Sequence, residues 1–144
     1  MRLVVDANIL IGELLRKRGR ILFNHPRLNL YISERVVNET GYELNKRINL
    51  MIQKEKIESY LGEETLSFWK STINDTIKIV HLSEFSHLEE EAKNRIPRDP
   101  HDWEIVAISI LLNADIWTQD SDFIGCGRAT WTTETLIYFL NKNT

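Results

Sequence analysis

The chain of 144 residues predicts an α/β fold, in which a mostly parallel sheet of four or five strands lies between two layers of helices. Short apolar runs rich in β-branched residues, such as residues 3–5, are typical of strands covered on both faces. Stretches with helical spacing of apolar residues separate these runs. Because neither a repeat nor a low-complexity linker interrupts the chain, we expect one domain spanning residues 1–144.

Composition and charge exclude several classes of protein. The formal net charge of −3 argues against a globally basic nucleic-acid binder, and the single cysteine, Cys126, excludes an internal disulfide. No apolar run approaches the ~20 residues that span a bilayer. The first residues lack the pattern of a signal peptide, since their apolar run meets Asp6 at once. We therefore expect a cytoplasmic protein without a membrane partner.

The first strand, residues 3–5, ends at the carboxylate of Asp6, and an apolar helix follows. Open α/β sheets hold ligands and metal ions at the carboxyl ends of their strands, so Asp6 and the nearby Asn8 are candidate site residues. We expect Gly19 to stop the helix. The basic residues 16–20 suit either a solvated helix end or a patch that contacts phosphate.

The second strand is expected over residues 28–32, followed by Ser33 as the N-cap of a helix. Apolar residues recur at helical spacing from Val36 to Ile48. Glu39 lies at the edge of this apolar face, one turn from Val36. It is either an acid that points back to the sheet edge or an ordinary surface glutamate.

The middle and the end of the chain contain elements without candidate site residues. Residues 50–72 look helical, with a break at Gly62, and suit either a helical pair over the sheet or part of a dimer surface. We also expect a third strand over residues 76–80, a charged helix over residues 84–95 and a last strand over residues 129–131. A terminal helix follows over residues 136–140, capped by Thr132 or Thr133.

Acids return at residues 99–102. Asp99 before Pro100 suits an N-cap, and Asp102 would lie in the first turn of a core-facing helix that ends near Asn113. Capping and the helix dipole explain both aspartates in structural terms. The alternative is that Asp102 faces the same sheet edge as Asp6.

A further strand over residues 115–118 also ends in acids, Asp120 and Asp122. Its structural explanation is an aspartate-rich turn. A second strand with an aspartate at its carboxyl end nevertheless strengthens the expectation of a shared acidic site.

Four carboxylates can therefore meet at one edge of the sheet, from Asp6, Glu39, Asp102 and Asp120. Such a cluster persists only when protons or cations neutralise it. Oxygen ligands without cysteine or paired histidine favour Mg²⁺ or Mn²⁺. Such ions activate water and stabilise displacement at phosphorus, which fits phosphodiester hydrolysis.

Three neighbouring residues would support this centre. Asn8 and Thr118, each two residues from an aspartate, could hydrogen-bond to the ligands and orient them. Asp122 is a candidate fifth acid that binds metal directly or through water.

The sequence resembles a PIN domain and is similar to the single-domain VapC-type ribonuclease toxins. The resemblance depends on Val5-Asp6-Ala7-Asn8, on the helix that starts Asp102-Trp103-Glu104-Ile105-Val106-Ala107, and on Thr118-Gln119-Asp120-Ser121-Asp122-Phe123. Glu39 matches the position of the family's remaining acid, which lies on a helix. Residues 45–95 match only as generic helices and a strand.

The resemblance implies a metal-dependent endoribonuclease that cleaves single-stranded RNA. It implies metal binding by Asp6, Glu39, Asp102 and Asp120, and supporting roles for Asn8, Thr118 and Asp122. It also implies a homodimer and, for a toxin, an inhibitory antitoxin protein. The sequence departs from the family at Gln119, where a basic residue is usual, and offers Asp99 as a second candidate beside Asp102.

Two other functions are weighed against this expectation. The first is a catalytically weak module that binds RNA or a protein partner through the acidic cleft. The second is a metal-dependent phosphatase with an aspartyl nucleophile, which Asp6-Ala7-Asn8 disfavours because it lacks the second aspartate such enzymes use.

Overall fold

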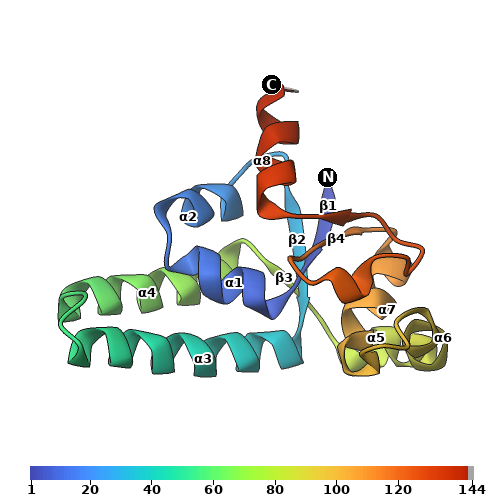
Figure 1. The fold of residues 1–144 in the computed structure, drawn as a ribbon, viewed down its shortest axis with the longest axis horizontal. Coiled ribbons are helices and arrows are strands. Elements are labelled where there is room, and N and C mark those ends of the chain that lie inside the picture. Colours follow the sequence, from blue (N-terminus) through green and yellow to red (C-terminus); the bar gives the residue numbers. More distant parts are fainter. Residues whose placement is uncertain (143–144) are drawn as a thin grey trace.

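Five parallel strands form the centre of the computed structural model, which describes residues 1–142 (Figure 1). Their order across the sheet is β3-β2-β1-β4-β5, and every neighbouring pair is parallel. This confirms the predicted α/β class. The strands are β1 (Arg2–Val5), β2 (Asn29–Ser33), β3 (Lys78–Val80), β4 (Asp115–Trp117) and β5 (Thr130–Trp131).

Helices cover both faces of this sheet (Figure 1). The α-helices are α1 (Ala7–Leu14), α2 (Lys17–Phe23), α3 (Glu34–Gln53), α4 (Ser59–Asp75), α5 (Leu82–Phe85), α6 (Glu89–Arg95), α7 (Trp103–Leu112) and α8 (Thr133–Lys142). Short 3₁₀ turns occupy Ser86–Leu88, Pro100–Asp102 and Ser121–Phe123. Within residues 1–142, no helix combines the length and the apolar character needed to cross a membrane.

The alternation of side chains along the strands produces two separate cores. Leu3 and Val5 of β1 join the core under α1, α3 and α8, whereas Val4 points to the opposite core beneath α5 to α7. In β4, Trp117 and Ile116 divide in the same way. The central strands are therefore apolar on both faces, as the continuous apolar run at the start of the chain predicts.

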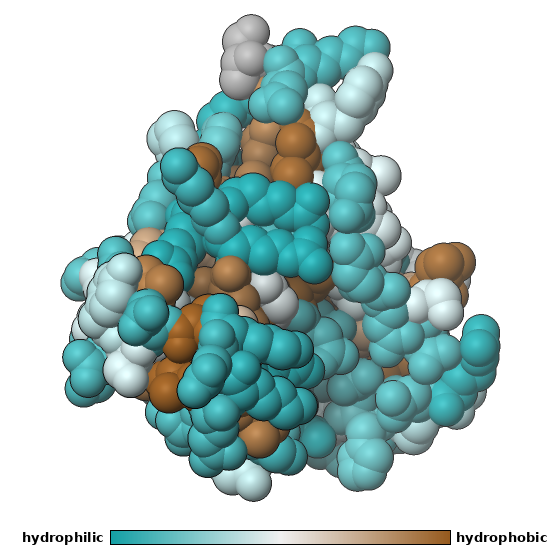
Figure 2. Space-filling view, turned by 60° about the vertical axis from the view of Figure 1, so that its left-hand side comes forward, coloured by the Kyte–Doolittle hydropathy of each residue, from teal (hydrophilic) through white to brown (hydrophobic). Residues whose placement is uncertain are grey.

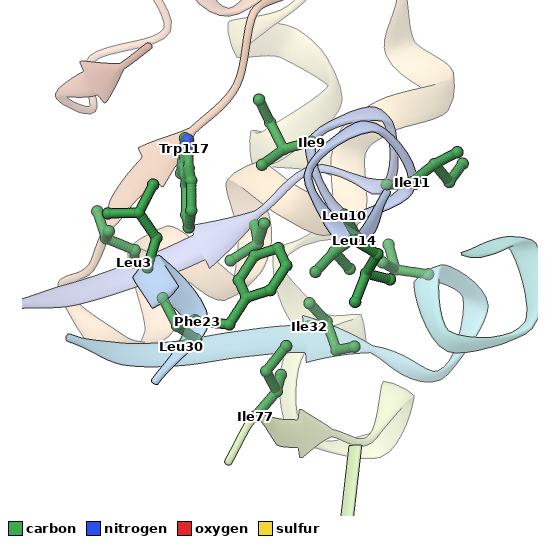
Figure 3. Close-up of a cluster of buried hydrophobic side chains, with 14 of the residues drawn as sticks. Leu3, Ile9, Leu10, Ile11, Leu14, Phe23, Leu30, Ile32, Ile77 and Trp117 are labelled. Atoms are coloured by element: carbon green, nitrogen blue, oxygen red, sulfur yellow. The ribbon is translucent and has the colours of Figure 1, made fainter. Parts of the chain in front are cut away.

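The first core is the larger one and gathers residues that are distant in sequence. Side chains of α1, such as Ile9 and Leu10, lie over the strands beside the Phe23 and Trp117 rings (Figure 3). These rings are tilted, with centroids 5.7 Å apart. The indole N–H of Trp117 donates a hydrogen bond to the hydroxyl of Thr133 at 3.0 Å, so the buried ring fixes the start of α8.

Helix α3 begins at the predicted cap, since the Ser33 hydroxyl accepts a hydrogen bond from the Val36 N–H at 3.2 Å. It pairs with α4 as a helical hairpin that extends away from the sheet (Figure 1). The prediction of a helical pair within residues 50–72, divided at Gly62 and lying over the sheet, is therefore wrong in its bounds: the break lies between Gln53 and Ser59, and α4 runs through Gly62. On the face of the molecule that Figure 2 shows, the surface is mostly hydrophilic and apolar side chains form small, separate patches.

Two glycines that were expected to end helices lie inside them. A Cβ atom at Gly19, within α2, would collide with the backbone carbonyl of Glu13, so glycine permits α2 to cross close to the end of α1. A Cβ atom at Gly62, within α4, would lie 2.7 Å from Ile48 of α3. In both cases, close approach between helices selects the glycine.

The charged helix expected over residues 84–95 is also different in the structure. It is divided by the 3₁₀ turn Ser86–Leu88 into the short helix α5 and the helix α6. Burial of Phe85 before this turn explains the interruption, because the chain changes direction to place that ring in the second core. At the end of the chain, Thr132 rather than Thr133 caps α8, since its hydroxyl accepts a hydrogen bond from the Thr135 N–H at 3.2 Å.

Candidate active site

The carboxyl edge of the sheet is where β1 and β4 end side by side. Val5 and Trp117 are paired at these ends, and the chain leaves them in opposite directions across the sheet, towards β2 on one side and β5 on the other. Such a switch point leaves a crevice between the two connections. Asp6 follows β1 directly, and Thr118 and Asp120 follow β4, so three of the predicted site residues flank this crevice.

Thr118 connects the ends of the two strands. Its buried hydroxyl donates a hydrogen bond to Oδ2 of Asp6 at 2.8 Å and accepts one from the backbone N–H of Asp120 at 2.9 Å. One threonine thus holds both the carboxylate of Asp6 and the backbone of Asp120.

The carboxylate of Asp120 has a hydrogen bond of its own. Asp120 is the N-cap of the 3₁₀ turn Ser121–Phe123, and its Oδ1 accepts a hydrogen bond from the backbone N–H of Asp122 at 2.9 Å. The side chain of Asp122 instead pairs with Arg98, with 3.3 Å between Oδ1 and Nη2. Asp122 is not among the residues that line the cleft.

Asp99 and Asp102 both come close to Asp120. One carboxylate oxygen from each of these three residues lies within 4.8 Å of the other two. Asp99 precedes the 3₁₀ turn and Asp102 precedes α7, yet neither side chain makes a capping hydrogen bond. Asp99 thus stands at the predicted N-cap position before Pro100, but neither side chain caps a helix, and the structure brings both aspartates towards Asp120.

A cleft connects this cluster to Asp6, Asn8 and Glu39. Glu39 lies in the second turn of α3, so the structure places it at the sheet edge rather than on a remote surface. The residues that line the cleft are Asp6, Ala7, Asn8, Ser33, Arg35, Val36, Glu39, His101, Asp102, Glu104, Ile105 and Asp120.

Burial and mutual repulsion raise the pKa values of two of these acids, Asp6 and Asp102. Burial raises the pKa of Asp6, the hydroxyl of Thr118 opposes this, and the charges of Asp120 and Glu39 raise it further. Burial, together with the charges of Asp6, Asp99 and Asp120, raises the pKa of Asp102 to about 6. The fold therefore holds these carboxylates close together without neutralising them.

Sequence reasoning missed Arg35 and Glu104, which also line the cleft. Nη1 of Arg35 donates a hydrogen bond to the backbone carbonyl of His101 at 3.1 Å and lies 3.6 Å from Oε2 of Glu104. The spacing of Arg35 and Glu39 was an available signal, because residues four apart share one face of a helix.

The donor set of the cleft suits hard divalent cations. The clustered groups are carboxylate oxygens, and the thiol of Cys126 is buried in the second core. Helices α1, α3 and α7 begin at this edge, so the positive ends of their dipoles point towards the acids. Such a site can hold Mg²⁺ or Mn²⁺ and bring it to an anionic substrate.

Comparisons with known proteins agree with this architecture. The model of the PIN domain family matches residues 4–141. The fold is similar to the crystal structure of PAE2754 from Pyrobaculum aerophilum, with a TM-score of 0.67 and 18% identity, covering 99% of this chain and 90% of that one. It is also similar to VapBC2 from Rickettsia felis bound to a DNA fragment from their promoter, with a TM-score of 0.61 and 14% identity, covering 92% of this chain and 98% of that one. No curated protein sequence matches the chain.

Proposed function

The chain belongs to the PIN domain family, and from this premise we propose that it is a Mg²⁺- or Mn²⁺-dependent ribonuclease that cleaves phosphodiester bonds of single-stranded RNA. PIN domains are generally nucleases. One observation carries the proposal: carboxylates of Asp99, Asp102 and Asp120 converge beside the buried Asp6, and burial and repulsion raise the pKa values of Asp6 and Asp102. Acids held in this way favour a cation that neutralises them.

Asp6, Glu39, Asp102 and Asp120 are the proposed metal ligands and catalytic acids. All four line the cleft, and their oxygens match the preference of Mg²⁺ and Mn²⁺. Asp99 lies close enough to join them. Asp122 would take part only by giving up its ion pair with Arg98.

The proposed chemistry divides between the ion and the chain. The bound ion activates water and stabilises charge at the phosphate. Thr118 orients Asp6 and Asp120 through its two hydrogen bonds, and Asn8 offers a polar group at the cleft surface.

We further propose that residues 1–144 act as one cytoplasmic domain that forms a homodimer and is the toxin of a toxin–antitoxin pair. The resemblance to VapC-type toxins and the fold similarity to VapBC2 of Rickettsia felis support this context. Light scattering of the purified protein tests the dimer, and co-purification with the product of an adjacent small gene tests the antitoxin.

Cleavage of labelled single-stranded RNA tests the nuclease. Purified protein is assayed with Mn²⁺, Mg²⁺ or EDTA, beside Asp6→Asn and Asp102→Asn. Asp75→Asn is the matched control, since it makes the same chemical change at an exposed position of α4. Metal-dependent cleavage that both site variants lose and the control keeps is the expected result.

Other outcomes would reject parts of the proposal. Equal cleavage by all variants identifies a contaminating activity. Mn²⁺ binding that depends on Asp6, without cleavage of any RNA, favours the catalytically weak binding module instead.

A further inference from the structure

We propose that Arg35 binds a phosphate group of the RNA at the rim of the acidic cleft, next to the phosphate that is cleaved. This inference rests on the proposed function and adds a substrate-binding residue to it. Arg35 lies in the first turn of α3, on the same face as Glu39, and both residues line the cleft.

The negative charge of the cleft explains why RNA binding would need a positively charged side chain at its rim. Five acids line it, namely Asp6, Glu39, Asp102, Glu104 and Asp120. Among residues 1–142, Arg35 is the one lysine or arginine that lines the cleft with them. Since a divalent ion neutralises only part of this negative charge, an RNA strand that approaches the rim meets repulsion that Arg35 locally offsets.

The contacts of Arg35 leave part of its guanidinium available. Both contacts run through Nη1, to the carbonyl of His101 at 3.1 Å and to Glu104 at 3.6 Å. Within residues 1–142, no group accepts a hydrogen bond from Nε or Nη2. The side chain of Arg35 is 51% exposed, whereas that of Glu104 is 14% exposed, so a largely buried acid holds an arginine that still faces solvent.

The guanidinium of Arg35 is held so that it can donate hydrogen bonds to two oxygens of one phosphate. Glu104 and the His101 carbonyl orient the guanidinium, and its remaining N–H groups form the fork that binds phosphate with two parallel hydrogen bonds. The tether also keeps the guanidinium paired with Glu104, so the clustered aspartates stay available for the cation.

A purely structural role, in which Arg35 only joins α3 to the 3₁₀ turn before Asp102, makes different predictions. It would change Mn²⁺ affinity and the maximal cleavage rate, because the acids themselves would move. A phosphate-binding role changes the RNA concentration needed for half-maximal cleavage and the dependence of that concentration on salt.

Single-turnover cleavage of labelled RNA at several salt concentrations, with Mn²⁺ binding measured by calorimetry, separates these roles. For Arg35→Ala we expect a half-saturating RNA concentration raised about tenfold, equivalent to one charge-assisted hydrogen-bonding interaction. The logarithmic salt dependence should fall by about 0.7, the value for one single-strand phosphate contact. Mn²⁺ affinity and the maximal rate should stay close to those of the unchanged protein. For Arg35→Lys, which keeps the charge but loses the planar fork of donors, the half-saturating RNA concentration should lie between those of the unchanged protein and Arg35→Ala.

Arg47→Ala is the matched control, because it removes the same charge from α3 at a distance greater than the Debye length of about 8 Å. An Arg35→Ala variant that behaves like Arg47→Ala overturns the proposal. A loss of Mn²⁺ affinity equal to the loss of RNA affinity also overturns it. If the unchanged protein binds Mn²⁺ but cleaves no RNA, the proposed function itself fails, and the role of Arg35 fails with it.

Discussion

Helix α1 has a buried carboxylate at each end, and their surroundings are opposite. Asp6, 8% exposed, precedes the helix, and Glu13, 5% exposed, lies in its last turn. Two nitrogens of Arg18 hold Glu13 at 2.9 and 3.3 Å, and Arg16 lies 3.8 Å from it. The carboxylate of Asp6 accepts hydrogen bonds from the hydroxyl of Thr118 and from the backbone of Asn8, and the charges near it are those of the acids Asp120 and Glu39.

The difference separates Glu13, whose charge is paired within the fold, from Asp6, which we propose binds a metal ion. The charge of Glu13 is balanced inside the chain, and the pair joins the end of α1 to α2. Arg35, the lysine or arginine that lines the cleft with Asp6, is paired with Glu104 instead. A buried carboxylate without a cationic partner is therefore the more informative sign of a site.

Removing the charge at each end of α1 in turn should have the largest effect and tests whether the two acids differ in role. Asp6→Asn should lower the RNA cleavage rate by more than about 100-fold, since loss of a ligand exceeds the 10–100-fold effect of outer residues. The same variant should melt at a higher temperature in EDTA, because a buried, repelled charge is gone. Glu13→Gln should keep its cleavage rate. Equal activities of the two variants would refute the distinction.

Thr118→Val sharpens the comparison without removing any charge. The valine keeps the shape but loses the hydrogen bonds to Asp6 and Asp120, so Mn²⁺ affinity should fall by about 10–100-fold. Calorimetric titration with Mn²⁺ measures this. Thr76→Val, at a more exposed threonine after α4, provides the comparison, and unchanged affinity in Thr118→Val would argue against an orienting role.

Glu13→Gln tests the structural end of α1. It leaves Arg18 without its buried charged partner, so we expect the free energy of unfolding to fall by about 1.5–3 kcal/mol and the melting temperature by about 3–10 °C. Glu134→Gln removes the other, exposed acid near Arg18 at 3.6 Å and should change the melting temperature by much less. Thermal unfolding in EDTA measures both variants, and similar values for the two would contradict the special role of burial.

The pH dependence of stability tests the repulsion among the acids of the cleft. The pKa of Asp102 is raised to about 6 from its usual 3.8, so the folded, metal-free protein binds this proton more tightly than the unfolded chain does. Its contribution to the free energy of unfolding therefore decreases as the pH rises from about 4 to about 6 and is constant above that range. In EDTA, the difference in melting temperature between the unchanged protein and Asp102→Asn should follow this course. A difference that does not vary with pH would contradict it.

The elements that carry the site were predictable because their signals are local. An apolar run that ends in Asp6, and another that ends before Asp120, place both acids at the same edge of a parallel sheet, and the structure agrees. The serine cap before α3 fixed the turn on which Glu39 lies.

The remaining features depend on contacts between distant residues. Gly19 and Gly62 suggested helix ends, but close packing of helices selected them. The sequence predicted that Asp102 could join Asp120 at the sheet edge, but for Asp99 it favoured a cap, and the folded chain shows that a carboxylate oxygen of each lies near Asp120. Arg35 was missed, because its partners His101 and Glu104 lie far along the sequence.

The hydrogen bond between Thr118 and Asp6 spans 112 positions of the chain. During synthesis, Asp6 and Glu39 leave the ribosome long before β4 exists to pair with β1. Until then the first acids have neither their orienting hydroxyl nor the carboxylates of Asp102 and Asp120. The proposed nuclease would thus be inert on the ribosome until β4 has been synthesised and has paired with β1.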